Sequence, residues 1–346
     1  MRKHRAKVRE NASYRPGPGA VRPGCSCAPS HTEWSAMPTD PRSLMYLRFA
    51  RPSLSRTVAL ALTCITLVAC GGVDTGASSS SELPVAQADP TLNAKLPDKI
   101  REAGVITVAL DVAYPPMEYF DTDGKTMIGL DLDFGRAVAQ VLGVEIEFTN
   151  LAFPSILTSL QGNRFDMTIT AITDTPERRD VVTFVDYLST SGNVLVAKGN
   201  PKGIADFTTL CGRPVGVQAG TTQLADAERR QAACAAAGKP PITLSTFQTN
   251  DAANLALSSG RVDAVYSQSI VNTYVMAQAP TTYEVVGEEL NKTPIGIAIM
   301  KDKTRLIEAV QGAVQKLMDD GIYAKILAKW HLESRAIPTA TINGGQ

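Results

Sequence analysis

An excess of charge of one sign, long apolar runs and internal repeats are all missing from this sequence, and each absence excludes a class of protein. Lys and Arg number 34 and Asp and Glu also number 34, so no basic surface for nucleic acid is predicted. No apolar stretch is long enough to span a bilayer, and no repeat with a period of roughly 20–50 residues is visible. The 346 residues, of which 44% are hydrophobic, are typical of a globular protein with about two domains.

The N-terminal part of the chain differs in composition from the rest. Residues 1–44 are rich in Arg, Pro, Gly and Ser and show no sustained apolar period, so we assign them no fold. From Met45 onward, three arginines precede an apolar run over 57–68, whose length is typical of the hydrophobic part of a signal peptide. We therefore expect Met45 to be the true start of the protein and 1–44 to be a mis-annotated or disordered extension.

The apolar run ends in Leu67-Val68-Ala69-Cys70-Gly71-Gly72, which resembles the lipobox of bacterial lipoproteins. The resemblance implies that the Cys70 thiol receives a diacylglycerol and becomes the new N-terminus after cleavage. The alternative is a short buried strand that contains an ordinary cysteine. The segment that follows is rich in Gly and Ser, which is typical of a flexible tether. We expect a signal peptide at 45–69 and a tether at 70–94.

Export also bears on the six cysteines of the chain. Three of them precede Cys70 in the part that would be removed, and Cys70 itself would be modified, which leaves Cys211 and Cys234. An even pair in an exported domain predicts a disulfide, because no cluster of His or Cys that favours a metal site lies nearby. Two separate buried thiols are the alternative. The pattern predicts no metal and no cofactor.

Short β-rich runs alternate with helical patterns beyond the tether. This rhythm predicts an α/β fold with mostly parallel sheets and helices on both faces, in which ligands bind beyond the carboxyl ends of the strands. The predicted strands are 106–110, 145–150, 166–170, 194–198, 214–218, 243–247, 264–267 and 295–300, and the predicted helices are 133–141, 154–161, 222–237, 251–259, 304–318 and 323–330.

Two strand-to-helix junctions carry residue types that bind anions. In the first, Asp174 or Thr175 can cap a helix that begins at Pro176, and Arg178 lies in its first turn. Free N–H groups, hydroxyls and a guanidinium then converge, which suits a carboxylate or a phosphate. The second junction, at 220–223, is an exposed helix start with two threonines. Each junction by itself is equally consistent with an ordinary capped helix, but two in one chain favour a binding site.

Six segments occur in a specific order along the chain, namely 111–119, 129–133, 173–178, 220–223, 260–264 and 321–330. Together they resemble the polar amino-acid-binding family of periplasmic receptors, which serve ATP-driven (ABC) importers. The resemblance covers residues 95–335, and its specificity comes from the order and spacing of the segments, since no single one is decisive.

The resemblance implies a two-lobed fold, the type II periplasmic-binding-protein fold, with two mostly parallel sheets joined by a two-strand hinge that closes on the ligand. Lobe 1 would comprise 95–196 plus 289–337, and lobe 2 would comprise 197–288. The protein would be a monomeric lipoprotein on the extracytoplasmic face of the membrane, without nucleic acid as a partner and without catalytic activity. It would pass an amino acid or a derivative to an ABC permease.

The same resemblance implies where the ligand carboxylate binds. Arg178 would form a bidentate pair with it, assisted by Thr173 and, from across the cleft, by Thr222. The backbone carbonyl of Ala171 would face the amine of the ligand.

Three further residues would contact the rest of the ligand. Tyr114 and Phe153 would flank its side chain, and Asp111 would face its amine or the polar end of its side chain. The alternatives are ordinary core packing for the two aromatic residues and a turn or cap role for Asp111. We interpret Glu118 as a structural residue of the same turn.

One position departs from the family. After 260–264 the family usually presents an Asp that accepts the α-ammonium of the ligand, and this position is Gln268 here, beside Ser267. A neutral amide holds a buried ammonium less well than a carboxylate does. Either Asp111 supplies the missing charge or the ligand is not a standard α-amino acid, and we favour the second interpretation.

Two other classes of function stay open. Some relatives with this fold are cleft enzymes of the cyclohexadienyl or arogenate dehydratase type, which need a general acid or base in the cleft. His331 is the only histidine beyond the tether and lies away from the expected site, so Asp111 or Glu118 would have to serve. The remaining alternative is a ligand sensor that signals to a membrane partner.

Overall fold

The computed structural model describes residues 83–345, which all belong to one compact unit of the chain, Thr75–Gln346. The predicted signal peptide, the predicted lipidation site Cys70 and most of the predicted tether lie outside the described residues. Within the described part of the chain, no helix is both long and apolar enough to cross a membrane.

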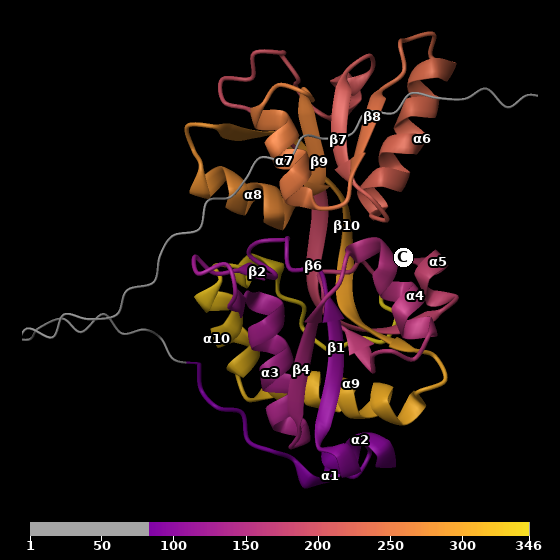
Figure 1. Ribbon diagram of the computed structural model, residues 1–346, viewed down its shortest axis with the longest axis vertical. Coiled ribbons are helices and arrows are strands. Elements are labelled where there is room, and N and C mark those ends of the chain that lie inside the picture. Colours follow the sequence, from indigo (N-terminus) through magenta and orange to yellow (C-terminus); the bar gives the residue numbers. More distant parts are fainter. Residues whose placement is uncertain (1–82, 346) are drawn as a thin grey trace, which may run out of the picture. The chain divides into compact units, whose positions relative to one another are not determined.

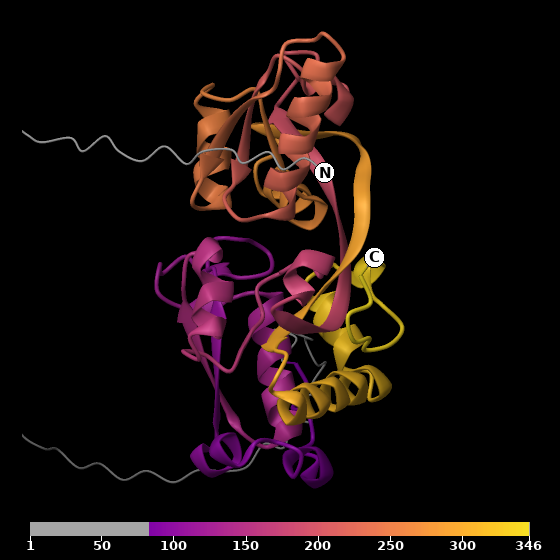
Figure 2. The same ribbon diagram turned by 90° about the vertical axis from the view of Figure 1, so that its right-hand side faces the viewer.

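The strands follow one hydrogen-bonded order, β4-β1-β5-β10-β6-β9-β7-β8, which runs through two lobes (Figure 1). In the first lobe β1 is parallel to β4 and β5, and in the second lobe β7 is parallel to β8 and β9. The long strands β6 and β10 are antiparallel to each other and run from one lobe into the other, as Figures 1 and 2 show. The bounds are β1 Val105–Leu110, β4 Glu145–Asn150, β5 Met167–Thr168, β6 Val182–Ala197, β7 Pro214–Gln218, β8 Thr243–Phe247, β9 Ala264–Gln268 and β10 Tyr283–Met300.

Helices pack against the sheet in both lobes (Figure 1). In the first lobe they are α1 Pro90–Asn93, α2 Asp98–Ala103, α3 Leu130–Leu142, α4 Ile156–Gln161, α5 Pro176–Arg179, α9 Thr304–Asp319 and α10 Ile322–Lys329, together with the 3-10 turns η1 Phe153–Ser155 and η3 Glu333–Arg335. In the second lobe they are η2 Phe207–Leu210, α6 Thr222–Ala236, α7 Asn250–Ser258 and α8 Ser269–Gln278. A small hairpin of β2 Tyr119–Phe120 and β3 Met127–Ile128 completes the first lobe.

Helical periodicity explains how the first lobe forms its core. Along α9 the fully buried residues Leu306, Val310, Val314 and Leu317 are spaced by four, four and three positions, so they lie on one face that packs on the sheet. Helix α3 begins directly after Gly129, whose φ of 142° and close approach to the carbonyl of a neighbouring turn leave no room for a Cβ atom. The resulting fold is the mostly parallel, two-lobed α/β fold that the sequence predicted.

The strands that connect the lobes were the least well predicted part of the fold. The prediction of 194–198 covers only the end of β6, and 295–300 covers only the end of β10. The missed part of β6 contains buried polar residues, among them Ser189, Thr190 and Ser191, which do not give the apolar pattern of a core strand. Helix α8 was not predicted because it follows β9 without an intervening turn.

A disulfide joins Cys211 and Cys234 within the second lobe, with Cα atoms 5.7 Å apart, which confirms the predicted pairing. Cys234 lies on α6 and packs into the core of that lobe, while Cys211 follows η2. The bond therefore links the one long helix of the second lobe to the segment that leads into β7.

Both ends of the described chain pack against the first lobe. The packed residues extend beyond 95 and 337, the outer limits predicted for lobe 1, and the lobe boundaries themselves stay a prediction. The N–H of Asp89 donates to the carbonyl of Val141 over 2.8 Å, and Leu92 is buried. At the other end, the N–H of Gly344 donates to the carboxylate of Asp186 on β6 over 2.8 Å. The packed structure thus includes the last residues of the predicted tether.

Candidate functional site

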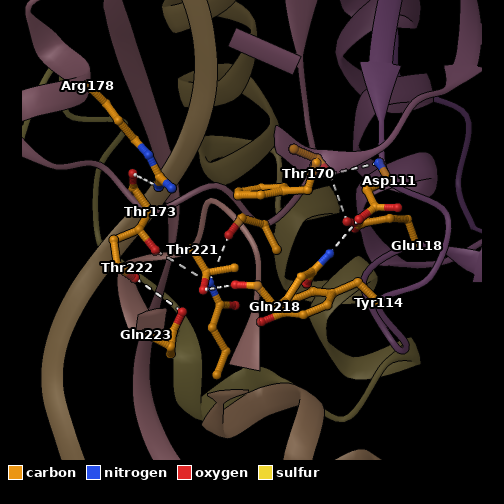
Figure 3. A pocket seen from close by; sticks show the side chains of 13 residues that line it. Asp111, Tyr114, Glu118, Thr170, Thr173, Arg178, Gln218, Thr221, Thr222 and Gln223 are labelled. Atoms are coloured by element: carbon orange, nitrogen blue, oxygen red, sulfur yellow. Dashed lines mark hydrogen bonds between the residues drawn. The ribbon is translucent and has the colours of Figure 1, made fainter. Parts of the chain in front are cut away.

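A cavity lies between the two lobes, where the carboxyl ends of β1, β5, β7 and β9 meet (Figure 3). Its space is about 300 Å³, including the part that is open to solvent. The structure brings all eight predicted ligand-binding residues together in its lining. The lining residues are Asp111, Tyr114, Glu118, Phe153, Thr170, Ala171, Thr173, Arg178, Gln218, Thr221, Thr222, Gln223 and Gln268.

Arg178 is a half-buried cation that is held by carbonyl groups. Its Nη1 donates to the carbonyl of Thr173 over 2.8 Å, and its Nη2 donates to the carbonyl of Gly220, across the cleft, over 3.0 Å. Its guanidinium carbon lies 5.6 Å from the centre of the Phe153 ring. Burial lowers the pKa of Arg178 to about 10, so it remains charged at neutral pH. Within residues 83–345 no carboxylate forms an ion pair with it, which leaves its charge available to an anionic ligand.

Two neighbouring arginines in helix α5, Arg178 and Arg179, have different partners. Thr175, one of the two predicted caps, accepts a hydrogen bond from the N–H of Arg178 over 3.3 Å. The other candidate, Asp174, is buried and forms an ion pair with Arg179, with 2.6 Å between Oδ1 and Nε. Arg179 therefore has a partner within its own lobe, while Arg178 is directed to the cavity.

Ala171 turns its carbonyl oxygen toward the second lobe. Its φ is +46°, which is unusual for a residue with a Cβ atom, and its N–H donates to Oδ2 of Asp131 over 2.7 Å. Its carbonyl accepts a hydrogen bond from Nε2 of Gln268 over 2.9 Å, and Oγ1 of Thr173 lies 3.5 Å from the same nitrogen. The carbonyl of Ala171, which was expected to face the amine of a ligand, thus accepts a hydrogen bond from the amide of Gln268 instead.

Asp111 directly follows β1 and is buried at the other side of the pocket from Arg178, as Figure 3 shows. Its Oδ2 accepts a hydrogen bond from Nε2 of Gln218 in the second lobe over 2.7 Å, and its N–H donates to Oγ1 of Thr170 over 3.0 Å. Burial raises the pKa of Asp111 to about 6, so it is mostly ionised at pH 7.

Glu118 also lines the cavity, although the sequence indicated only a structural role. The residue is almost completely buried, and its Oε1 accepts a hydrogen bond from Thr170 over 2.9 Å. Burial, and after it the negative charge of Asp131, raise the pKa of Glu118 well above its usual range. Asp131 itself accepts hydrogen bonds from the hydroxyl of Tyr187 over 2.6 Å and from the N–H of Ala171 over 2.7 Å, and thereby supports the wall around Ala171.

The remaining predicted residues lie on the two walls of the cavity. The hydroxyl of Tyr114 is 3.2 Å from Oγ of Ser267 in the second lobe. Thr222 begins α6 and donates to Oε1 of Gln223 over 3.2 Å, while Thr221 caps the helix by accepting from the N–H of Leu224.

Direct hydrogen bonds join the two lobes across the cavity. The pairs are Gln218 with Asp111, Gln268 with Ala171, Arg178 with Gly220, Tyr114 with Ser267 and, outside the cavity, Tyr274 with Tyr119. The structure is therefore a closed one, in which groups of the second lobe satisfy buried polar groups of the first.

Five lining residues were not among the predicted ligand contacts: Thr221 and Gln223 belong to the predicted junction at 220–223, Glu118 was interpreted as structural, and Thr170 and Gln218 were missed. Thr170 and Gln218 each end a predicted strand. Because ligands bind at the carboxyl ends of parallel strands, the last residue of every predicted strand is a candidate, and this rule includes both. The described residues contain no group of three or more His, Cys, Asp or Glu side chains that could hold a metal ion.

Comparisons with known proteins agree with this geometry. The model of the bacterial extracellular solute-binding proteins, family 3, matches residues 106–333. The arginine-binding protein ArgT of Corynebacterium glutamicum is 32% identical over 302 residues, which are 87% of this chain and 98% of that protein. An ancestral arginine-binding protein bound to arginine is 33% identical, with a TM-score of 0.61 over 66% of this chain and 98% of its own. The ancestral amino acid-binding protein AncCDT-1, a precursor of cyclohexadienyl dehydratase, is 31% identical, with a TM-score of 0.61 over 69% and 99%.

Proposed function

The chain belongs to family 3 of the bacterial extracellular solute-binding proteins, and from this premise we propose that it is the substrate-binding lipoprotein of an ABC importer. It binds an amino acid or an amino-acid-like carboxylated solute in the cavity between its lobes and delivers this ligand to a permease. The protein acts as a monomer and performs no catalysis.

The observation that carries the proposal is the unpaired cation at Arg178. A guanidinium that is held by two carbonyls, without an ion-pair partner among residues 83–345, still has N–H groups to offer to a carboxylate. Thr173 and Thr222 contribute hydroxyls to the same anion site.

The opposite side of the cavity suits the distal part of the ligand. Asp111 is an anion at neutral pH and accepts a cationic or amide group there, while the rings of Tyr114 and Phe153 flank the side chain. A positive site for the carboxylate and a negative site for the distal end together fit a solute with the polarity of arginine. The arginine-binding relatives support this class of ligand.

Titration calorimetry on the purified chain tests this function. A thermal-shift screen of amino acids, opines and betaines first identifies ligands, and the dissociation constant of the best ligand is then measured. We expect micromolar or tighter binding of a carboxylated solute, with no binding of the matched compound in which the carboxylate is replaced by an amide. Equal binding of the acid and the amide would contradict the role of Arg178.

The membrane anchor and the importer need separate tests. Mass spectrometry of the membrane-extracted protein should show a diacylated cysteine, Cys70, at the mature N-terminus. Deletion of the gene in the cells that produce the protein should abolish uptake of the ligand identified above. A mature chain that retains 1–44, or unchanged uptake, would contradict these parts of the proposal.

A dehydratase is the second candidate function. Asp111 favours it, because this buried cavity carboxyl has a pKa of about 6 that suits proton transfer near neutral pH. The ancestral neighbour AncCDT-1 is itself an amino acid-binding protein, although it is a precursor of cyclohexadienyl dehydratase. Incubation with cyclic carboxylated dienols and analysis of the mixture by NMR separates the two functions. A receptor returns the compound unchanged, whereas an enzyme releases water, carbon dioxide from the ring carboxylate and an aromatic product.

A further inference from the structure

Gln268 presents its amide to the cavity in a fixed orientation. The residue ends β9 and is only 4% exposed, and its Nε2 donates to the carbonyl of Ala171 over 2.9 Å. Because a carbonyl oxygen can only accept, the group that faces Ala171 must be the NH₂ half of the amide. The other half, Oε1, is buried and has no hydrogen-bond partner within residues 83–345. A buried acceptor without a donor is costly, and a ligand that supplies the donor removes this cost.

A chain of contacts places this amide beside the carboxylate site. Nη1 of Arg178 donates to the carbonyl of Thr173, and Oγ1 of Thr173 lies 3.5 Å from Nε2 of Gln268. A ligand whose carboxylate binds Arg178 therefore brings its adjoining carbon, and whatever that carbon carries, next to Thr173, Ala171 and Gln268.

The acceptors at this point do not suit a free ammonium. An ammonium has three donors and a full charge, and away from water it needs a carboxylate or several free acceptors. The carbonyl of Ala171 already accepts from Gln268, and the free atom, Oε1, belongs to a neutral amide. Of the two cavity carboxyls, Asp111 accepts from Gln218 through Oδ2, and Glu118 accepts from Thr170 through Oε1 while its Oε2 has no partner within residues 83–345.

We propose that Gln268 selects carboxylates whose adjoining carbon carries one neutral hydrogen-bond donor, as in N-acyl amino acids and 2-hydroxy acids, and disfavours those with a free α-ammonium. One N–H or O–H group then donates to Oε1 of Gln268, and the bond from Nε2 to Ala171 stays intact. This inference rests on the proposed function. It adds to the carboxylate site at Arg178 a site for the group on the adjoining carbon of the ligand.

Matched sets of ligands test the inference on the wild-type protein. Each set has one side chain, that of arginine, glutamine, phenylalanine or alanine, and three members: the amino acid, its Nα-acetyl derivative and the corresponding 2-hydroxy acid. Calorimetry on the purified chain should give, in the set that binds best, at least about tenfold tighter binding for one neutral member than for the amino acid. The arm that binds better, acetyl or hydroxyl, identifies the source of the donor.

The isosteric variant Gln268→Glu should reverse this preference, because a carboxylate there attracts an ammonium and repels the carbonyl of Ala171. The control Gln278→Glu adds the same charge to an exposed glutamine of the second lobe, at the end of α8 and outside the cavity, and should leave the order within the best set unchanged. A failure of Gln268→Glu to fold does not affect the comparison on the wild-type protein.

The outcomes separate this inference from the proposed function. Tighter binding of the free amino acid than of both neutral members in the best set would overturn the role of Gln268 and leave the carboxylate receptor standing. Absence of binding in every set would overturn both.

Discussion

The two walls of the cavity differ in chemistry, although one ligand would touch both. Every acidic and basic lining residue, namely Asp111, Glu118 and Arg178, comes from the first lobe. The second lobe contributes only hydroxyl and amide side chains, those of Gln218, Thr221, Thr222, Gln223 and Gln268. The charges of the site therefore belong to one lobe, and the neutral hydrogen-bonding groups that meet them belong to the other.

The difference has an energetic consequence. Arg178 and Glu118 each have a partner in their own lobe, Thr173 and Thr170. The contacts that Arg178 and Asp111 make with the second lobe are hydrogen bonds to neutral groups, so separation of the lobes would break no ion pair in the cavity. Each neutral contact from the second lobe contributes only about 1 kcal/mol. Substitutions on the first wall should therefore affect affinity more than substitutions on the second, and the following predictions test this order.

The largest effect is expected for Arg178→Ala on the charged wall. Removal of one side of a desolvated charge pair costs about 2–5 kcal/mol, so the dissociation constant of a carboxylated ligand should rise at least roughly thirtyfold. Arg229→Ala, which removes an exposed arginine of the second lobe that pairs with Asp226, is the matched control and should change affinity little. Titration calorimetry measures the dissociation constants of both variants. Comparable losses of affinity for the two would contradict the dominant role of the charged wall.

The next effect concerns stability and is confined to the second lobe. Among the described residues only this lobe contains a disulfide, and the double variant Cys211→Ser, Cys234→Ser should lower the free energy of unfolding by about 3 kcal/mol. Ligand affinity of the folded protein should hardly change, because neither cysteine lines the cavity. Denaturant titration of the oxidised protein, the reduced protein and the variant decides this, and a free energy of unfolding that is insensitive to reduction would exclude it.

A smaller loss of affinity is expected on the neutral wall. Gln218→Ala removes the second-lobe donor to Asp111, a hydrogen bond to a charged group, and should weaken binding by about 1.5 kcal/mol, or roughly tenfold. Gln231→Ala serves as the control. This glutamine also lies in the second lobe and donates to the carbonyl of Ile242, away from the cavity. A loss for Gln218→Ala as large as that for Arg178→Ala would show that the two walls contribute equally.

The smallest effect is a pH dependence of stability that originates in the first lobe. Burial raises the pKa of Asp111 and of Asp186 to about 6, above the value near 4 in an unfolded chain. Such a group stabilises the folded protein below its unfolded pKa, and this contribution is lost as the pH rises through about 6. The melting temperature should therefore be higher at pH 5 than at pH 8 by a few degrees. Asp111→Asn should reduce the difference, and a melting temperature that rises steadily from pH 5 to pH 8 would contradict the sign.

The sequence predicted much of the site, because the relevant residues occupy recognisable local positions. Thr173 and Arg178 lie at a strand-to-helix junction, Asp111 directly follows a strand, and the order of the surrounding segments is specific to the family. The eight predicted residues do line one cavity, whereas their individual roles stay predictions. The disulfide was predicted because Cys211 and Cys234 are the only cysteines after Cys70, the predicted lipidation site.

Burial and orientation depended on the tertiary structure alone. Nothing near Glu118 in the sequence shows that Asp131 will lie beside it and help to raise its pKa, and nothing near Gln218 shows that it will bind Asp111. The polar part of β6 did not show the apolar pattern of a strand. It forms a strand because it pairs with β9 and β10, which lie far away in the sequence, and its polar side chains are buried there. Local sequence determined which residues stand at the ends of strands and helices. The packing of distant segments decided which of their polar groups are already paired and which, like Oε1 of Gln268, remain without a partner in the described chain.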